Sequence, residues 1–154
     1  SQDDPDDPQY GMHDPMEPVA VDVVVHGGET IRSETAALTA IATPGHTPGA
    51  LSWAWDSCDA AGECIGIVYA DSLSPVSRDD YRFGDHPDYV AACRAGLQRL
   101  RDLKCDLLLT PHPSASEMVA RAASGSLIGG MSCADYADAV EARLDKRLAD
   151  EAGG

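Results

Sequence analysis

The sequence has few basic residues and no long apolar run. Eleven Lys and Arg residues stand against 26 Asp and Glu residues, which gives a net charge of −15. Such an acidic surface repels nucleic acids and anionic membranes, so we expect neither as a partner. No apolar run approaches the roughly 18 residues of a membrane span, and the acidic start is unlike a signal peptide.

The chain also has no phosphate-binding loop, no dinucleotide fingerprint and no Cys-x-x-Cys pair. Cys58 and Cys64 flank a short polar loop, and Cys105 and Cys133 each open an element, so these four positions suit disulfides. Cys93 falls on an apolar helix face and is expected to be a buried free thiol. Disulfides indicate an oxidising compartment, either the periplasm or the outside of the cell. Thiolate ligation of zinc is the weaker alternative, because no closely spaced cysteine pair exists.

A chain of 154 residues predicts one folded domain. Residues 1–18 are rich in Asp and Pro, which predicts an extended acidic arm or a connecting segment, and residues 19–154 form the folded part. Because the chain begins with Ser1, we expect a processed protein or a piece of a longer one.

Strands dominate the first half of the sequence. β-Branched residues predict a strand at Val19–Val25, paired with Glu29–Arg32 through a turn at His26–Gly28. Apolar runs predict further strands at 36–42, 50–55, 64–70 and 105–109.

Helices are predicted in the second half. Asp85 is expected to cap a helix that carries Pro87 in its first turn and runs to about Lys104. A short helix should end near Ala123, and Ser132 with Asp135 resembles a capping box for a final helix. Strands followed by helices mixed with strands predict an α+β layered sandwich.

Two histidines stand between prolines directly after apolar strands. His46 lies in the Thr43–Gly49 turn, and His112 lies in Thr110–Pro113. Because proline fixes φ on both sides of each imidazole, the pattern indicates side chains that are aimed at a target, such as a metal ion. Ordinary tight turns with solvated histidines are the alternative.

A third strand ends in Asp71, Ser72 and Ser74. Three strands that end together would bring these residues to the histidines. Asp71 could ligate a metal, orient a histidine or cap a turn. Ser72 and Ser74 lack a Gly-x-Ser-x-Gly elbow and are poor nucleophiles, but they suit hydrogen bonding to a substrate carboxylate or turn capping.

Several blocks of the sequence resemble the subclass B3 metallo-β-lactamases. They are residues 42–49, 52–53, 68–74 and 105–116, with 7–11 and 85–89 in support. The resemblance extends from about Asp7 to Ala152, and it implies the αβ/βα sandwich of that family. The chain looks like the C-terminal β/α half of this sandwich.

The resemblance implies an enzyme with two zinc ions that hydrolyses the amide bond of β-lactams. His46 would complete a three-histidine site, and His112 would ligate the second zinc. Ser72 and Ser74 would contact the β-lactam carboxylate. Cys105–Cys133 would be the disulfide of the family, and Cys58–Cys64 resembles one found in some members.

The family's His-x-His-x-Asp-His run is missing from this sequence. We therefore expect a partner, the N-terminal half of the same fold, and no activity from this chain alone. One alternative is another hydrolase of the superfamily, acting on a thioester or lactone, with Asp71 bridging two metals. Another is a non-catalytic, disulfide-stapled binding module.

Overall fold

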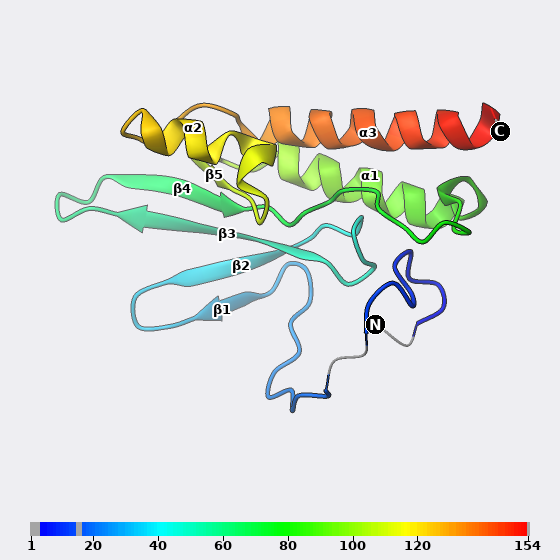
Figure 1. The fold of residues 1–154 in the computed structure, drawn as a ribbon. Coiled ribbons are helices and arrows are strands. Elements are labelled where there is room, and N and C mark those ends of the chain that lie inside the picture. Colours follow the sequence, from blue (N-terminus) through cyan, green and yellow to red (C-terminus); the bar gives the residue numbers. More distant parts are fainter. Residues whose placement is uncertain (1–3, 15–16, 154) are drawn as a thin grey trace.

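The chain forms one five-stranded sheet whose strands lie in sequence order. A computed structural model describes residues 4–14 and 17–153. The strands are β1 (Thr30–Arg32), β2 (Ala37–Ala42), β3 (Leu51–Cys58), β4 (Cys64–Tyr69) and β5 (Leu107–Leu109). Neighbours from β1 to β4 are antiparallel, whereas β5 pairs parallel with β4 (Figure 1). A parallel pair requires a long crossover, and the segment between β4 and β5 supplies it.

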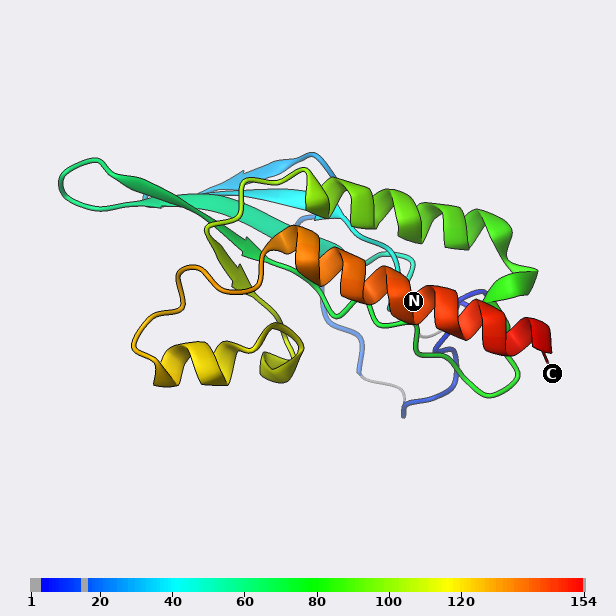
Figure 2. The ribbon, with the colours of Figure 1, turned by 90° about the horizontal axis from the view of Figure 1, so that it is seen from above.

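The helices gather on one side of this sheet. They are α1 (Pro87–Arg101), α2 (Met118–Ala123) and α3 (Cys133–Gly153), with the 3₁₀ turns η1 (Phe83–Asp85) and η2 (Pro113–Ser116). The long helices α1 and α3 lie side by side (Figure 2), and Arg94 and Arg101 of α1 form ion pairs with Glu141 of α3. The α+β class predicted from the sequence is confirmed.

The main core lies between the sheet and these two helices. Val68 of β4 and Leu108 of β5 are fully buried against Leu97 and Leu100 of α1 and Val140 of α3. Each such side chain contributes about 1.5–3 kcal/mol by leaving water. A smaller cluster of Tyr81, Phe83, Cys93 and Leu144 closes the far end of the helix pair.

The structure contradicts one of the two predicted helix caps and confirms the other. Asp85 does not cap α1, because the chain first makes the η1 turn; the N-cap is His86, and Pro87 is the first helical residue. At α3 the Ser132 hydroxyl accepts the Asp135 N–H at 3.0 Å, and the Asp135 carboxylate accepts the Ser132 N–H at 3.1 Å. This reciprocal pair confirms the capping box, with Asp in the place of Glu or Gln.

The predicted strand at Val19–Val25 was wrong. These residues are irregular, and four of their valines are 69–83% exposed. Instead of pairing with that run, β1 pairs with β2, where Thr30 lies opposite Thr39. The strand preference of β-branched residues depends on packing against neighbouring strands, and this exposed run pairs with none of the described strands.

The acidic arm packs on the body of the protein. Arg78 donates from its side chain to the Asp7 carbonyl at 2.8 Å and from its backbone to the Pro8 carbonyl at 2.9 Å. Its guanidinium also lies 5.9 Å from the centre of the Tyr10 ring. Asp7 is consequently only 3% exposed. One arginine thus holds residues that the sequence alone left as an extended segment.

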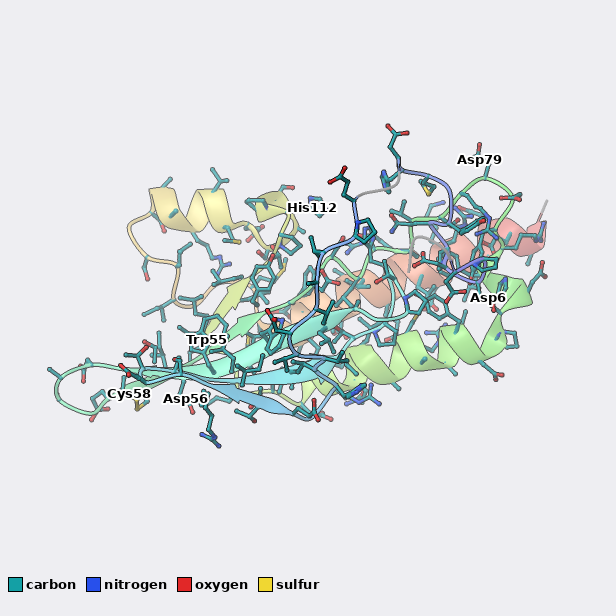
Figure 3. The ribbon with its side chains drawn as sticks, turned by 90° about the horizontal axis from the view of Figure 1, so that it is seen from below. Asp6, Trp55, Asp56, Cys58, Asp79 and His112 are labelled. Carbon is teal, nitrogen blue, oxygen red and sulfur yellow. A yellow bond between two sulfur atoms is a disulfide. The ribbon has the colours of Figure 1, made fainter. Side chains whose placement is uncertain are left out.

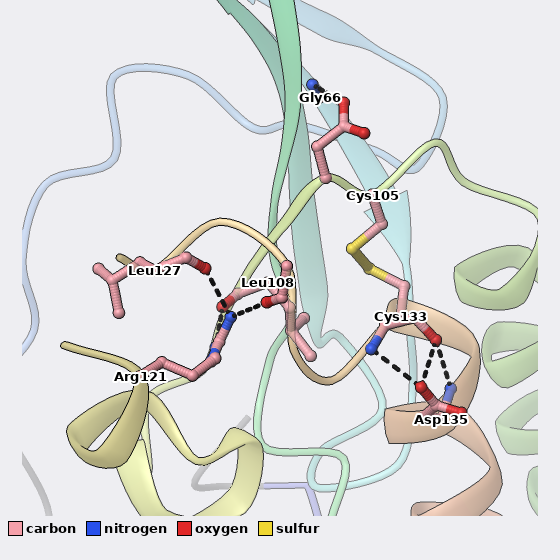
Figure 4. Close-up of a disulfide and its surroundings, with 10 residues drawn as sticks. Gly66, Cys105, Leu108, Arg121, Leu127, Cys133 and Asp135 are labelled. Carbon is pink, nitrogen blue, oxygen red and sulfur yellow. Dashed lines mark hydrogen bonds between the residues drawn. A yellow bond between two sulfur atoms is a disulfide. The ribbon is translucent and has the colours of Figure 1, made fainter. Parts of the chain in front are cut away.

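Both expected disulfides are present. Cys58 and Cys64 lie opposite each other across the β3–β4 hairpin, and Cys105–Cys133 joins the approach to β5 to the start of α3 (Figure 4). Cys93 is a buried free thiol, and burial raises its pKa to about 11. In the part of the chain that the structure describes, no helix has the length and apolarity needed to cross a membrane.

The longer of the two disulfide loops should matter more for stability. Loop entropy predicts a loss in unfolding free energy of about 3.6 kcal/mol for Cys105→Ala/Cys133→Ala and about 2.4 kcal/mol for Cys58→Ala/Cys64→Ala. Urea unfolding of each double variant measures these losses, with reduced wild type as the control. A larger loss at the hairpin pair would contradict the expectation.

Candidate functional site

The loops that carry the predicted site residues all leave the sheet at one end. β2 and β4 run in the same direction because both are antiparallel to β3, and β5 is parallel to β4. The chain therefore leaves β2, β4 and β5 at a common end, which we call the site rim. It carries the His46 loop after β2, the Asp71–Ser74 segment after β4 and the His112 loop after β5.

The His46 loop is fastened to the segment after β4. The Nδ1 atom of His46 lies 3.4 Å from the Ser74 carbonyl oxygen. A carbonyl only accepts, so this long hydrogen bond requires the proton on Nδ1 and leaves the lone pair on Nε2. The His46 ring is half-buried. In this tautomer the imidazole can bind a metal ion through Nε2.

The segment after β4 has an unusual backbone that α3 stabilises. Leu73 is buried and has a φ of 51°, a left-handed conformation that is rare for a leucine. The Tyr136 hydroxyl on α3 lies 2.9 Å from the Ser72 carbonyl and 3.1 Å from that of Asp71, and it donates to them. Burial raises the pKa of Tyr136 to about 12, so this donor keeps its proton at neutral pH.

The two serines of this segment differ in their surroundings. Ser72 is 5% exposed, and its Oγ has no hydrogen-bond partner within the described residues. Ser74 is half-buried, and its Oγ makes a long bond of 3.4 Å to the Ser72 carbonyl. A buried hydroxyl group without a hydrogen bond lowers the free energy of unfolding by about 1–3 kcal/mol. Such a group is therefore a candidate for hydrogen bonding to a ligand.

Buried hydroxyl groups join neighbouring strand ends beneath the site rim. Ser52 Oγ of β3 accepts the Asp71 N–H at 3.0 Å, and it lies 2.8 Å from Thr43 Oγ1, which precedes the His46 loop. Under β5, Thr110 Oγ1 lies 2.7 Å from Ser116 Oγ and donates to the His112 carbonyl at 2.9 Å. The His112 backbone is thus fixed while its side chain is exposed.

Sequence reasoning missed two contacts that hold the His46 loop from other parts of the chain. Gln9 of the arm donates its amide to the His46 carbonyl at 3.0 Å, and Tyr89 of α1 donates its hydroxyl to the Gly45 carbonyl at 3.2 Å. Burial raises the pKa of Tyr89 and keeps it a donor. Both residues fall in blocks that resemble the family, and this was the only available signal.

Zinc sites in proteins need at least three protein ligands, and the described residues do not bring three together. Among residues 4–14 and 17–153, no group of three or more His, Cys, Asp or Glu side chains could hold a metal ion. The imidazoles of His46 and His112 match zinc in chemistry but fall short in number. The described residues therefore fit part of a zinc site and not a whole one.

Solved structures show the same fold in longer proteins, although no family model matches the sequence. The metallo-β-lactamase MIM-1 from Novosphingobium pentaromativorans is 46% identical, with a TM-score of 0.89 over 97% of this chain and 55% of its own. MIM-2, also a metallo-β-lactamase, is 52% identical, with a TM-score of 0.83 over 95% and 53%.

A third structure names the subclass. MEM-A1, a subclass B3 metallo-β-lactamase from a soil metagenome library, is 36% identical, with a TM-score of 0.87 over 96% of this chain and 59% of its own. The chain thus spans just over half the length of the solved proteins it matches.

Removing the Gln9 and Tyr89 contacts should loosen the His46 loop without unfolding the protein. Gln9→Ala and Tyr89→Phe each delete one donor, at a cost of about 1 kcal/mol. We expect faster hydrogen exchange at the Gly45 and Ala50 amides, measured by NMR. Tyr10→Phe removes a hydroxyl from an exposed ring and is the control. Unchanged exchange in both variants would show that these contacts do not hold the loop.

Proposed function

From the premise that this chain carries about half of the subclass B3 metallo-β-lactamase fold, we propose that it is part of a zinc-dependent enzyme that hydrolyses β-lactam antibiotics. The observation that carries the proposal is the convergence of the His46, Ser72–Ser74 and His112 segments on the site rim. Identity of 36–52% to these enzymes over nearly the whole chain supports it.

In this proposal His46 and His112 each supply one imidazole to a pair of zinc ions. Zinc, when bound, lowers the pKa of a water ligand toward about 7 and so supplies hydroxide for attack on the lactam carbonyl. The part of the fold that this chain does not span supplies the other ligands. The hydrogen bond from His46 Nδ1 to Ser74 supports the role of His46, because it leaves Nε2 as the metal-binding atom.

Ser72 and Ser74 are proposed to bind the β-lactam carboxylate. The Ser72 hydroxyl is without a partner in the described chain, and the Ser74 hydroxyl gives up only a long bond when it turns. Two hydroxyl donors at the site rim would hold an anionic group and orient the ring beside the metal ligands. Neither serine has an adjacent base, so neither acts as a nucleophile.

The proposal includes inactivity of the chain by itself, because two imidazoles do not make a dizinc site. It also includes an oxidising location, the periplasm or the exterior of the cell, which the two disulfides support.

Activity should appear when the missing part of the fold is restored. We expect carbapenem hydrolysis from this chain joined to the uncovered part of MIM-1 and supplied with zinc, and none from the chain alone. His46→Ala and His112→Ala should lower kcat/KM by more than about 100-fold, the upper cost of disturbing a metal ligand's support. Ser72→Ala should lower it about 10- to 100-fold, through lost bonding to a charged group. A folded, zinc-loaded assembly without turnover would contradict the proposal.

A substitution at Asp71 distinguishes the proposed β-lactam hydrolase from hydrolases in which a carboxylate bridges the metal ions. We expect Asp71→Ala in the joined protein to keep both zinc ions, measured by metal analysis after gel filtration, because the proposed ligands do not include this residue. His112→Ala is the positive control and should lose zinc. Loss of zinc from Asp71→Ala would favour a thioester or lactone hydrolase.

A further inference from the structure

His112 follows an edge strand whose outer side is held by a helix. On its inner side β5 pairs with β4, where the Leu109 carbonyl accepts the Ala70 N–H at 2.9 Å. An edge strand presents further backbone donors and acceptors on its outer side. There Arg121 of α2 donates to the Leu108 carbonyl at 2.7 Å (Figure 4). A side chain of α2 thus bonds a group that a neighbouring strand would otherwise bond.

The second bond between β5 and α2 has a sulfur acceptor. The Thr110 N–H donates to the Met118 Sδ atom at 3.3 Å, and the Thr110 hydroxyl oxygen lies 3.7 Å from the same sulfur. A thioether sulfur is a weak acceptor. Because Thr110 is only 3% exposed, its N–H depends on this weak acceptor rather than on water.

The chain makes an unusual turn that brings Met118 to this position. Glu117 lies between η2 and α2 and has a φ of 57°, a left-handed conformation that is uncommon for residues other than glycine. Such a conformation persists only where the surrounding structure favours it, and it often marks a functional segment. The turn returns the chain to β5, so that Met118 and Arg121 both reach the strand.

The threonine that bonds to Met118 also fixes the backbone of His112. Thr110 Oγ1 donates to the His112 carbonyl at 2.9 Å and lies 2.7 Å from Ser116 Oγ. The Ala115 N–H donates to the same carbonyl at 2.9 Å. Figure 3 shows His112 beside the short helices that follow it. A displacement of Thr110 would therefore move the backbone that carries the His112 imidazole.

We propose that Met118 is a positioning residue for His112, and that reversible oxidation of its thioether makes the site sensitive to hydroperoxides. The sulfur gives up two electrons and takes one oxygen atom from the peroxide, which leaves as water or an alcohol. Met118 is half-buried, so a small peroxide reaches it. Methionine sulfoxide reductases reverse this reaction. The inference rests on the proposed function for the role of His112 as a zinc ligand.

Oxidation removes the acceptor of the Thr110 N–H on either side of the sulfur. An oxygen atom added toward the amide would have to lie between the sulfur and a nitrogen only 3.3 Å away, where there is no room for it. An oxygen atom added on the other side draws electrons from the sulfur, which then faces the N–H with a partial positive charge. Both epimers of the sulfoxide therefore lose the hydrogen bond.

Two variants isolate Met118 from the other three methionines of the sequence. Met12→Leu/Met16→Leu/Met131→Leu leaves Met118 as the only methionine, and we call it the Met118-only variant. Adding Met118→Leu gives the methionine-free variant, which is the matched control. Leucine and methionine have similar volumes, so both variants are expected to fold, which circular dichroism checks.

The first test measures hydrogen exchange by NMR in this chain alone. In the Met118-only variant, hydrogen peroxide should make exchange at the Thr110 and Ala115 amides about 2- to 10-fold faster, as expected for the loss of one hydrogen bond. Reduction by methionine sulfoxide reductase should restore slow exchange. The methionine-free variant lacks the acceptor, so its Thr110 amide should exchange fast before peroxide and be unchanged after it. This control also reveals any effect of oxidation at Cys93.

Two results of this test would overturn the proposal. Mass spectrometry of peptides from the wild type locates the sulfoxides, and absence of oxidation at Met118 under conditions that oxidise the exposed Met12 would contradict the redox sensitivity. Faster exchange at Thr110 with unchanged exchange at Ala115 would contradict the positioning role, because the effect would not reach the His112 carbonyl.

The second test measures zinc binding in the chain joined to the uncovered part of MIM-1. Competition with a chelator should show about tenfold weaker zinc binding after oxidation of the Met118-only variant, and the reductase should restore it. The joined methionine-free variant controls for methionines in the MIM-1 part. Unchanged zinc affinity after oxidation of Met118 would overturn the proposal. A joined protein that binds no zinc contradicts the proposed function, and the exchange test then decides the role of Met118.

Discussion

The parallel pairing of β5 with β4 is the constraint on which the site depends. β2 and β4 share a direction through the antiparallel hairpins, and any chain with this meander would bring their ends together. β5 could have joined in either direction, and only the parallel one carries His112 to the end that holds His46. Four buried Leu and Val side chains of β4, β5 and α1 hold this pairing, so the geometry of the rim depends on the core beneath it.

The rim itself is stiffened by polar contacts rather than by apolar packing. Hydroxyl groups of Ser52, Thr43 and Thr110 bond the backbones and side chains at the strand ends, and Tyr136 reaches from α3 to the segment that carries Ser72. Such bonds fix the loops, whereas within the described residues the His46 ring and the Ser74 hydroxyl make only long hydrogen bonds and the Ser72 hydroxyl makes none. Backbone order with unused side chains is the condition for a preorganised binding site.

Sequence alone predicted the elements that local chemistry determines. The apolar runs that predicted β2 to β4 and the Ser132–Asp135 pair that predicted the start of α3 each act over a few residues, and both predictions are confirmed. The predictions failed where the conformation depends on residues that are distant in the sequence. The Val19–Val25 run lacks a neighbouring strand, and the contact from Gln9 to His46 joins residues 37 positions apart, which no periodicity reveals.

The same distinction explains why the loops at the site rim are ordered although the chain spans just over half the length of the solved proteins it matches. Contacts from the arm, β3, α1 and α3 position His46 and the Ser72–Ser74 segment. Among the residues that the structure describes, no group of three or more ligands could hold a metal ion, and Trp53 and Trp55 on the sheet face opposite the helices are only half-buried. Both features lie at the surface of the protein, whereas hydrogen bonds within the chain hold the loops behind them. A second layer of the fold would therefore add metal ligands to a site rim that is already ordered. Its binding would not carry the entropic cost of ordering that rim.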